Sequence, residues 1–163
     1  MPVPSDTTDY TIRPSIHSDI FYVAHRMREE DVAEVRAAGG LDPVQALIEG
    51  FKNSRQCYTA EWKGEPFIMF GVAPVDDVSG AVWLLGTPTV TKARVAFLKE
   101  SRRIIDEFHD DFPLLFNFVD ARNKVHIRWI EWLGFTFINN HESFGFECRE
   151  FLEFLRIRKC VNP

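Results

Sequence analysis

The chain has 163 residues and a formal net charge of -5, and it contains 15 Phe and 4 Trp. This length fits one domain with a single apolar core, and the aromatic content predicts that large flat side chains fill it. The negative charge argues against a protein that binds the nucleic-acid backbone, because such a protein needs a basic face. Nucleic acid is therefore not an expected partner.

The cysteines and the hydropathy pattern indicate the cellular setting. Cys57, Cys148 and Cys160 have neither the spacing of a zinc site nor that of a disulfide framework, so we expect no metal. No basic start leads into a long apolar segment, and no run of eighteen apolar residues occurs, so we expect neither a signal peptide nor a membrane span. These features predict a cytoplasmic protein.

The first forty residues predict an arm, a strand and a short helix. Residues 1–19 are rich in Pro, Ser, Thr and Asp without an apolar period, which is typical of a flexible N-terminal arm. Residues 20–163 then form a single domain. The apolar run 21–27 predicts a first strand, and Gly39-Gly40 ends a short helix that contains Val32.

The middle of the chain predicts a helix followed by three antiparallel strands. Asp42 and Gln45 flank a proline at the first helical position, and together they satisfy the amides of a helix start. Segments 57–62 and 66–73 are apolar and separated by a turn, which predicts a hairpin. Another apolar segment, 81–86, predicts the third strand.

The next elements predict a crossover connection. Thr91 is placed to cap a long helix that ends near Asp110, and the strand 114–119 follows. A strand, a helix and a second strand in this order predict parallel pairing of the two strands. We expect the helix to direct four side chains toward the sheet: Val95, Leu98, Ile105 and Phe108.

The last third predicts a helix and two strands. A helix over 123–133 ends at Gly134, and strands over 135–138 and 144–148 are separated by a turn over 139–143. The whole order predicts an α/β (α+β) fold with a mixed, mostly antiparallel central sheet of six to seven strands and helices on both faces.

The run from Asn123 to Phe135 carries a resemblance to a known family. It opens a helix at an Asn and ends in Leu133-Gly134-Phe135 before a strand. With the element order, this run resembles the GNAT (N-acetyltransferase-like) superfamily. The resemblance implies that acetyl coenzyme A binds where the fourth and fifth strands splay apart, and that an acetyl group passes to an amine of a small molecule or protein.

Longer segments resemble a narrower group. The segment Trp83-Leu84-Leu85-Gly86-Thr87 and the later segments 117–123 and 126–129 resemble the sequences of small GNAT-like proteins of short-tailed bacteriophages. Some of those are described as internal virion proteins. A protein of this kind would act in the host cytoplasm or in the virion.

The coenzyme site that the resemblance implies departs from the family pattern. Most GNAT enzymes bind the pyrophosphate with a Gln/Arg-x-x-Gly-x-Gly/Ala loop, whereas the segment Gly86–Arg94 lacks these glycines. It predicts either weak or altered coenzyme binding or a plain capped helix. A backbone amide around Leu85 to Thr87 would polarise the thioester carbonyl. The expected coenzyme contacts are Leu85, Thr87, Thr89, Thr91, Lys92, Ala93, Arg94 and Asn123.

The expected general acid is also missing. Many family members place a Tyr at the position of Ile130, and an Ile cannot donate a proton. His126 and Asp120 are the candidate catalytic residues that remain. The structural alternative for His126 is a hydrogen bond that holds its helix to a neighbouring element.

Two functions follow as hypotheses. The first is a GNAT-type N-acyltransferase, or a degenerate derivative of one, that uses acetyl coenzyme A or another acyl donor. The alternative is a non-catalytic GNAT-like phage protein that serves as a virion component or binds a host protein, since a fold does not carry its function with it.

Overall fold

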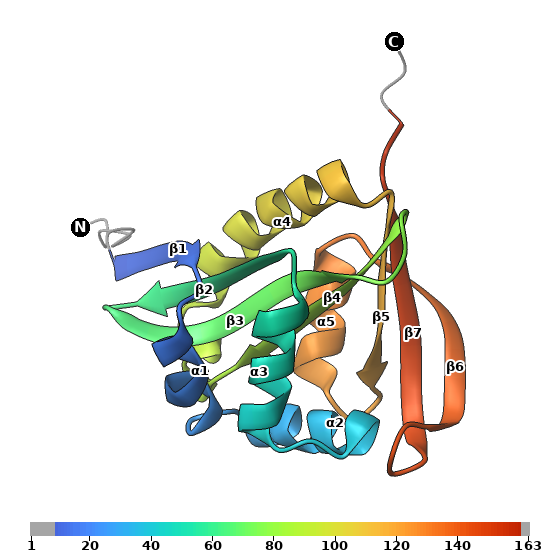
Figure 1. The fold of residues 1–163 in the computed structure, drawn as a ribbon, viewed down its shortest axis with the longest axis horizontal. Coiled ribbons are helices and arrows are strands. Elements are labelled where there is room, and N and C mark those ends of the chain that lie inside the picture. Colours follow the sequence, from blue (N-terminus) through green and yellow to red (C-terminus); the bar gives the residue numbers. More distant parts are fainter. Residues whose placement is uncertain (1–8, 161–163) are drawn as a thin grey trace, which may run out of the picture.

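The computed structural model describes residues 9–160, except for the side chain of Arg94. Within these residues one seven-stranded sheet has the order β1-β2-β3-β4-β5-β7-β6 (Figure 1). Neighbouring strands are antiparallel except β4 and β5, which are parallel as the crossover predicted. The predicted mixed, mostly antiparallel sheet is confirmed.

The elements have the following bounds in chain order: β1 Tyr10–Pro14, α1 His17–Ala24, α2 Glu29–Gly39, α3 Pro43–Asn53, β2 Gln56–Trp62, β3 Glu65–Pro74, β4 Ser79–Gly86, the 3-10 helix η2 Pro88–Thr91, α4 Arg94–Asp111, β5 Leu114–Asp120, α5 Lys124–Trp132, β6 Thr136–Phe144 and β7 Arg149–Ile157. Among the described residues, none of these helices has the length and apolar character needed to cross a bilayer.

Two apolar cores lie on opposite faces of the sheet. Helices α1, α2 and α3 pack on one face, where Leu47 and Met69 are fully buried. Helices α4 and α5 pack on the other face, where the core is aromatic and centred on Phe70, Phe97 and Phe108. This two-sided cover, visible in Figure 1, confirms the predicted layers.

The N-terminal predictions need correction. Residues 10–14, expected in a flexible arm, form strand β1 and pair with β2, and residues 17–24 form helix α1 instead of a strand over 21–27. The carboxylate of Asp19 accepts from Arg13 and from the backbone amide of Ile16, which fixes the start of α1 against the sheet. Residues 1–8 of the expected arm lie outside the described residues.

Helix α4 begins two residues later than predicted, because its N-cap position is Ala93. Thr91 is not its cap: the Thr91 hydroxyl donates to the carbonyl of Pro88 within η2. The helix starts at Arg94, and Leu98, Ile105 and Phe108 face the core as predicted. Val95 does not: it is 67% exposed, and Phe97 is the fully buried residue of the first turns.

The last two strands are longer than predicted. The expected turn over 139–143 lies inside β6, and the chain reverses over 145–148 instead, where Gly145 and Cys148 adopt positive φ angles of 73° and 51°. The polar residues of β6 lie on an edge strand, where exposed polar side chains are common. Their polarity therefore marked an edge and not a turn.

Candidate functional site

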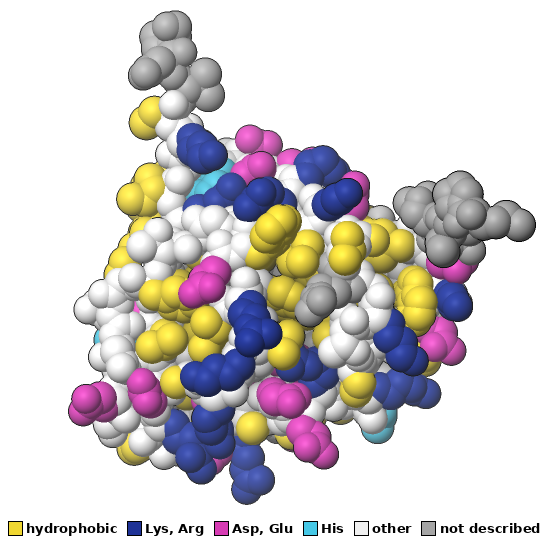
Figure 2. All heavy atoms as spheres, turned by 180° about the vertical axis from the view of Figure 1, so that it is seen from behind, with side chains coloured by type: hydrophobic (Ala, Val, Ile, Leu, Met, Phe, Trp, Pro, Cys, Tyr) yellow, Lys and Arg dark blue, Asp and Glu magenta, His cyan; other side chains and the backbone are white. Residues whose placement is uncertain are grey.

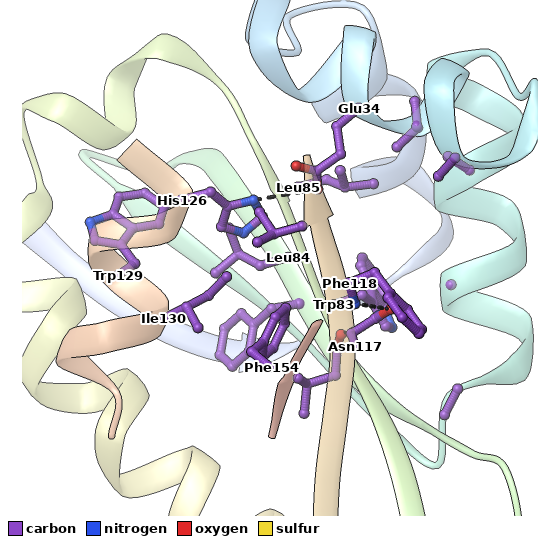
Figure 3. Close-up of a pocket in the computed structure, with 18 of the residues that line it drawn as sticks. Glu34, Trp83, Leu84, Leu85, Asn117, Phe118, His126, Trp129, Ile130 and Phe154 are labelled. Atoms are coloured by element: carbon purple, nitrogen blue, oxygen red, sulfur yellow. Dashed lines mark hydrogen bonds and ion pairs between the residues drawn. The ribbon is translucent and has the colours of Figure 1, made fainter. Parts of the chain in front are cut away.

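The candidate site is the gap between β4 and β5. The two strands pair only where Ser79–Ala81 meets Leu114–Phe116, and beyond this point they separate. A cavity of about 490 Å³ lies in the gap, with walls from α2, α3, α4 and α5 and from the adjoining strands (Figure 3). Its size is in the range of small-molecule sites.

Side chains of the chain itself bond to the backbone of both strand edges. Asn117 bridges the gap, because its Nδ2 donates to the carbonyl of Val82 at 2.7 Å and its Oδ1 accepts from the amide of Phe118 at 2.8 Å. A carboxylate oxygen of Glu34 accepts from the amide of Asp120 at 3.1 Å. Two β5 amides and one β4 carbonyl are thereby satisfied internally.

Helix α2 also covers the end of β4. Asp31 Oδ2 accepts from the amide of Gly86 at 3.0 Å, and the amide of Arg28 donates to the carbonyl of Gly86 at 2.9 Å. Asp31 is fully buried, and Arg28 forms an ion pair with it at 3.2 Å. The last residue of β4 is therefore bonded to α2 through both of its backbone groups.

These contacts belong to one polar cluster, buried except for the partly buried Glu34. It consists of the N-cap Arg28 with Asp31 and Glu34 of α2, and the N-cap Asn123 with His126 of α5. The Nδ2 of Asn123 donates to Asp31 at 3.0 Å and to Glu34 at 3.1 Å. His126 Nδ1 lies 3.5 Å from Glu34 Oε1, and Figure 3 shows the imidazole directed toward that carboxylate. The cluster joins α2 to α5 across the end of the gap.

Burial and charge shift the pKa values inside the cluster. Burial raises the pKa of Asp31 above its ordinary value, and the nearby His126 and Arg28 oppose this only in part. Burial alone would lower the pKa of His126, but the hydrogen bond and the charge of Glu34, with the charge of Asp31, raise its pKa overall. The fold therefore favours the protonated imidazole.

This shift predicts a pH dependence of stability. Because the pKa of His126 is raised in the folded state, its contribution is fully present below its unfolded pKa of about 6.5 and is lost as the pH rises through the folded pKa. We expect the free energy of unfolding, measured with urea, to fall as the pH rises above about 6.5. His126→Gln should flatten this dependence, and His25→Gln, on the exposed face of α1, should keep it. An equal slope in the wild type and His126→Gln would contradict the assignment.

Several of the residues predicted to bind coenzyme are buried in the fold instead. Leu85 is buried against α1 and α3, and Thr87 is 3% exposed, with its hydroxyl accepting from the amide of Thr89. Ala93 is a buried helix cap, whereas Thr91 and Lys92 are exposed. Arg94 opens α4, and its side chain lies outside the described part of the structure.

The amides expected to polarise a thioester have partners. Within Leu85–Thr87, the amide of Gly86 donates to the cluster carboxylate and that of Thr87 donates to the carbonyl of Phe67 at 2.9 Å. Successive amides along a strand point to opposite sides. The amide of Leu84 therefore points toward the gap, on the same side as that of Gly86.

The predicted catalytic residues are placed differently from one another. The carboxylate of Asp120 accepts from the side chain and the amide of Arg122, and these bonds lower the pKa of Asp120 although burial raises it. His126 and Ile130 line the cavity. Asn123 occupies the N-cap position of α5, where its side chain makes no capping hydrogen bond and reaches α2.

The cluster residues Arg28, Asp31 and Glu34 were not predicted from the sequence, and neither was Asn117. Arg28, Asp31 and Glu34 occur at spacings of three residues, which places them along one side of a short helix that also carries the partly buried Val32 and Val35. Charged residues at this spacing, next to apolar residues of the same helix, could have indicated that they face the interior. Nothing in the sequence around Asn117 distinguishes it from any polar residue in a strand.

Solved structures show which fold this is. Ard1 from Thermoplasma volcanium superposes with a TM-score of 0.72 at 13% identity, over 93% of this chain and 99% of that one. A GNAT-family acetyltransferase from Bacillus anthracis gives a TM-score of 0.69 at 9% identity, over 91% and 95% of the two chains. The chain has the GNAT fold. A GNAT acetyltransferase from Elizabethkingia anophelis with acetyl-CoA bound gives a TM-score of 0.63 at 10% identity, over 91% and 98%.

The sequence comparisons indicate phage relatives. Residues 69–142 match a family model described as bacteriophage T7, probable scaffold protein Gp13. The probable scaffold protein gp13 of Escherichia phage T7 is 26% identical over 140 residues, which cover 82% of this chain and 88% of that protein. The GNAT-fold chain thus resembles a phage protein in sequence, as its segments from Trp83 onward predicted.

Proposed function

We propose that this chain is a non-catalytic GNAT-fold protein that acts in the assembly of a phage particle. One observation carries the proposal: the strand edges in the gap between β4 and β5 are bonded to Asp31, Glu34 and Asn117. A coenzyme arm that entered this gap would have to displace these bonds. Since the carboxylate of Asp31 is fully buried and that of Glu34 is largely buried, their displacement would leave charges without partners.

The residues present do not fit acetyl coenzyme A well. The amide of Gly86 is taken by Asp31, the loop before α4 is a 3-10 helix without glycines, and Ile130 stands where the family general acid would stand. Each departure alone would weaken binding or chemistry. All three occur at the parts of the fold that such a reaction requires.

The similarity to a probable scaffold protein of phage T7 supports the assembly role. The GNAT fold supplies a rigid two-sided domain, and a fold by itself assigns no activity. In this proposal the chain works in the infected host cytoplasm or becomes part of the virion, and its partner is another protein of the particle or of the host.

A binding measurement tests the proposal. We expect no thermal shift and no calorimetric heat with acetyl coenzyme A or coenzyme A at about 1 mM, because the coenzyme would have to displace the hydrogen bonds on the strand edges of the gap. A GNAT enzyme such as the spermidine N-acetyltransferase of Vibrio cholerae serves as the positive control. Micromolar binding would contradict the proposal.

A genetic experiment tests the assembly role. Deletion of the gene from its phage should stop particle formation, and the His126→Gln and Glu34→Gln variants, which keep the shape of the gap, should restore it. Normal particle yield without the gene would contradict this role.

The second candidate function is an amine acetyltransferase. The cavity of about 490 Å³ favours it, since His126 and Glu34 line this space and a charged imidazole beside a carboxylate can transfer protons. Release of coenzyme A in the presence of spermine or an N-terminal peptide, lost in His126→Gln, would establish this function in place of the first.

A further inference from the structure

Two exposed stripes lie on the helices opposite α1–α3. On α4, three side chains follow the spacing i, i+4 and i+7, and on α5 three follow i, i+4 and i+8, so each set occupies one side of its helix. All six are exposed: Val95, Lys99 and Arg102 on α4, and Lys124, Arg128 and Trp132 on α5. We call these residues the α4–α5 surface.

Contacts between the helices bring the two stripes together. The guanidinium of Arg102 donates to the carbonyl of Trp132 and lies 4.9 Å from the centre of its indole ring. Nearer the start of both helices, the rings of Phe97 and Trp129 are 5.6 Å apart. The contacts advance in the same direction on both helices, so the two stripes lie side by side. Figure 2 shows Lys and Arg side chains gathered around apolar ones on this side of the molecule.

The cations of this surface lack acidic partners. Lys99, Lys124 and Arg128 form no ion pair with any residue of the described range 9–160. Three acidic residues of α4 form ion pairs with other cations: Glu100 and Glu107 pair with Arg103, and Asp106 pairs with Arg156. The other two, Asp110 and Asp111, lie at the C-terminal end of the helix. On α5 the one acidic residue is Glu131.

Positive charge on this face stands out in a chain whose net charge is -5. Unpaired cations on an acidic protein orient an approaching anionic partner toward one side. The face is thus electrostatically distinct from the rest of the chain.

Apolar side chains lie among the cations. Val95 is 67% exposed and Trp132 is 49% exposed, and Trp and Arg are the residues most often found at the energetic centres of protein interfaces. A solvent-exposed Trp held in place by a stacked guanidinium loses little freedom when a partner covers it. The surface combines an apolar anchor with surrounding positive charge.

We propose that the α4–α5 surface binds an amphipathic helix of a partner protein, with an apolar stripe flanked by acidic side chains. The apolar stripe would cover Val95 and Trp132, and the acidic residues would pair with Lys99, Lys124 and Arg128. A single helix can contact this surface alone, whereas an extended polyanion such as DNA or an anionic membrane also meets the neighbouring surface of a chain whose net charge is -5. This surface lies on the outer side of α4 and α5, so the inference does not depend on what enters the gap.

A defined peptide tests the inference. The probe is an 18-residue helical peptide with Leu at i, i+3, i+4 and i+7 and Glu on both sides of this stripe, and the matched control carries Lys at every Glu position. Nitrogen-15 amide spectra of the full chain should show saturable shifts confined to α4 and α5 with the Glu peptide and none with the Lys peptide. Lys99→Glu/Arg128→Glu should lower the affinity at least tenfold.

A second double variant controls for total charge. Arg36→Glu/Lys52→Glu makes the same charge change on α2 and α3 and should leave the affinity unchanged, and melting temperatures confirm that both variants fold. The inference is overturned if the Glu peptide fails to bind at about 1 mM or if both double variants bind it equally. It is also overturned if a DNA duplex or phosphatidylserine vesicles bind this surface more tightly than the peptide.

Discussion

Replacement of Asp31 by Ala should lower the free energy of unfolding by about 3–5 kcal/mol, the range found when one partner of a buried ion pair is removed. Asp31 is fully buried and holds Arg28, the amide of Gly86 and the side chain of Asn123. Its loss leaves a buried guanidinium and two donors without their acceptor. Urea unfolding followed by circular dichroism measures the change.

The neighbouring Glu30 supplies the matched control. Its carboxylate lies 3.6 Å from the guanidinium of Arg28 but is 56% exposed, so Glu30→Ala should cost less than about 1 kcal/mol. A loss for Asp31→Ala as small as that for Glu30→Ala would show that water replaces Asp31 and that the cluster does not fix α2.

Replacement of Phe97 by Ala should also cost about 3–5 kcal/mol, as for other large buried aromatic residues. Phe97 is fully buried, and its ring contacts those of Phe67, Phe70 and Trp129. Because these rings come from the sheet and from α5, truncation should weaken the contact of α4 with both. The midpoint of urea unfolding should fall with little change in slope.

Val95, two residues earlier on the same helix, is the comparison. Val95→Ala should change stability by less than about 0.5 kcal/mol, because the side chain is 67% exposed. It should nevertheless weaken binding of the acidic peptide if the α4–α5 surface is correct. A large stability loss at Val95 with a small one at Phe97 would mean that Val95, and not Phe97, packs on the sheet.

The elements recognised from sequence were those with local signals. Asp42 and Gln45 form the expected capping box of α3, and Gly134 ends α5 with a positive φ of 86°. Such signals involve residues a few positions apart, so they can be recognised without knowledge of the rest of the fold.

The elements that were missed depend on distant partners. Strand β1 forms because residues 10–14 pair with β2, about fifty positions away, and no local pattern marks it. The start of α4 depends on η2, whose 3-10 hydrogen bonds place the first residue of the helix after Thr91. Secondary structure that tertiary pairing imposes cannot be read from local propensity.

The candidate site was predicted in part for the same reason. His126 and Asn123 were identified on α5, but the residues they bond lie on α2, and the contact of Asn123 with Asp31 spans 92 positions. A single sequence without its fold cannot pair residues at this separation. Their roles remain predictions until the variants above are measured.

Because its own side chains bond the strand edges of the gap, the protein should not need a bound ligand for its stability. A domain whose strand edges depend on a bound metabolite loses part of its stability whenever that metabolite is diluted, by the mass-action relation between ligand concentration and folding. Here the side chains of Asn117 and Asp31 make those hydrogen bonds, and because they are part of the chain their effective concentration does not change on dilution. Such a domain should keep the same melting temperature in dilute buffer as in a coenzyme-rich extract, as the proposed role in a virion would require.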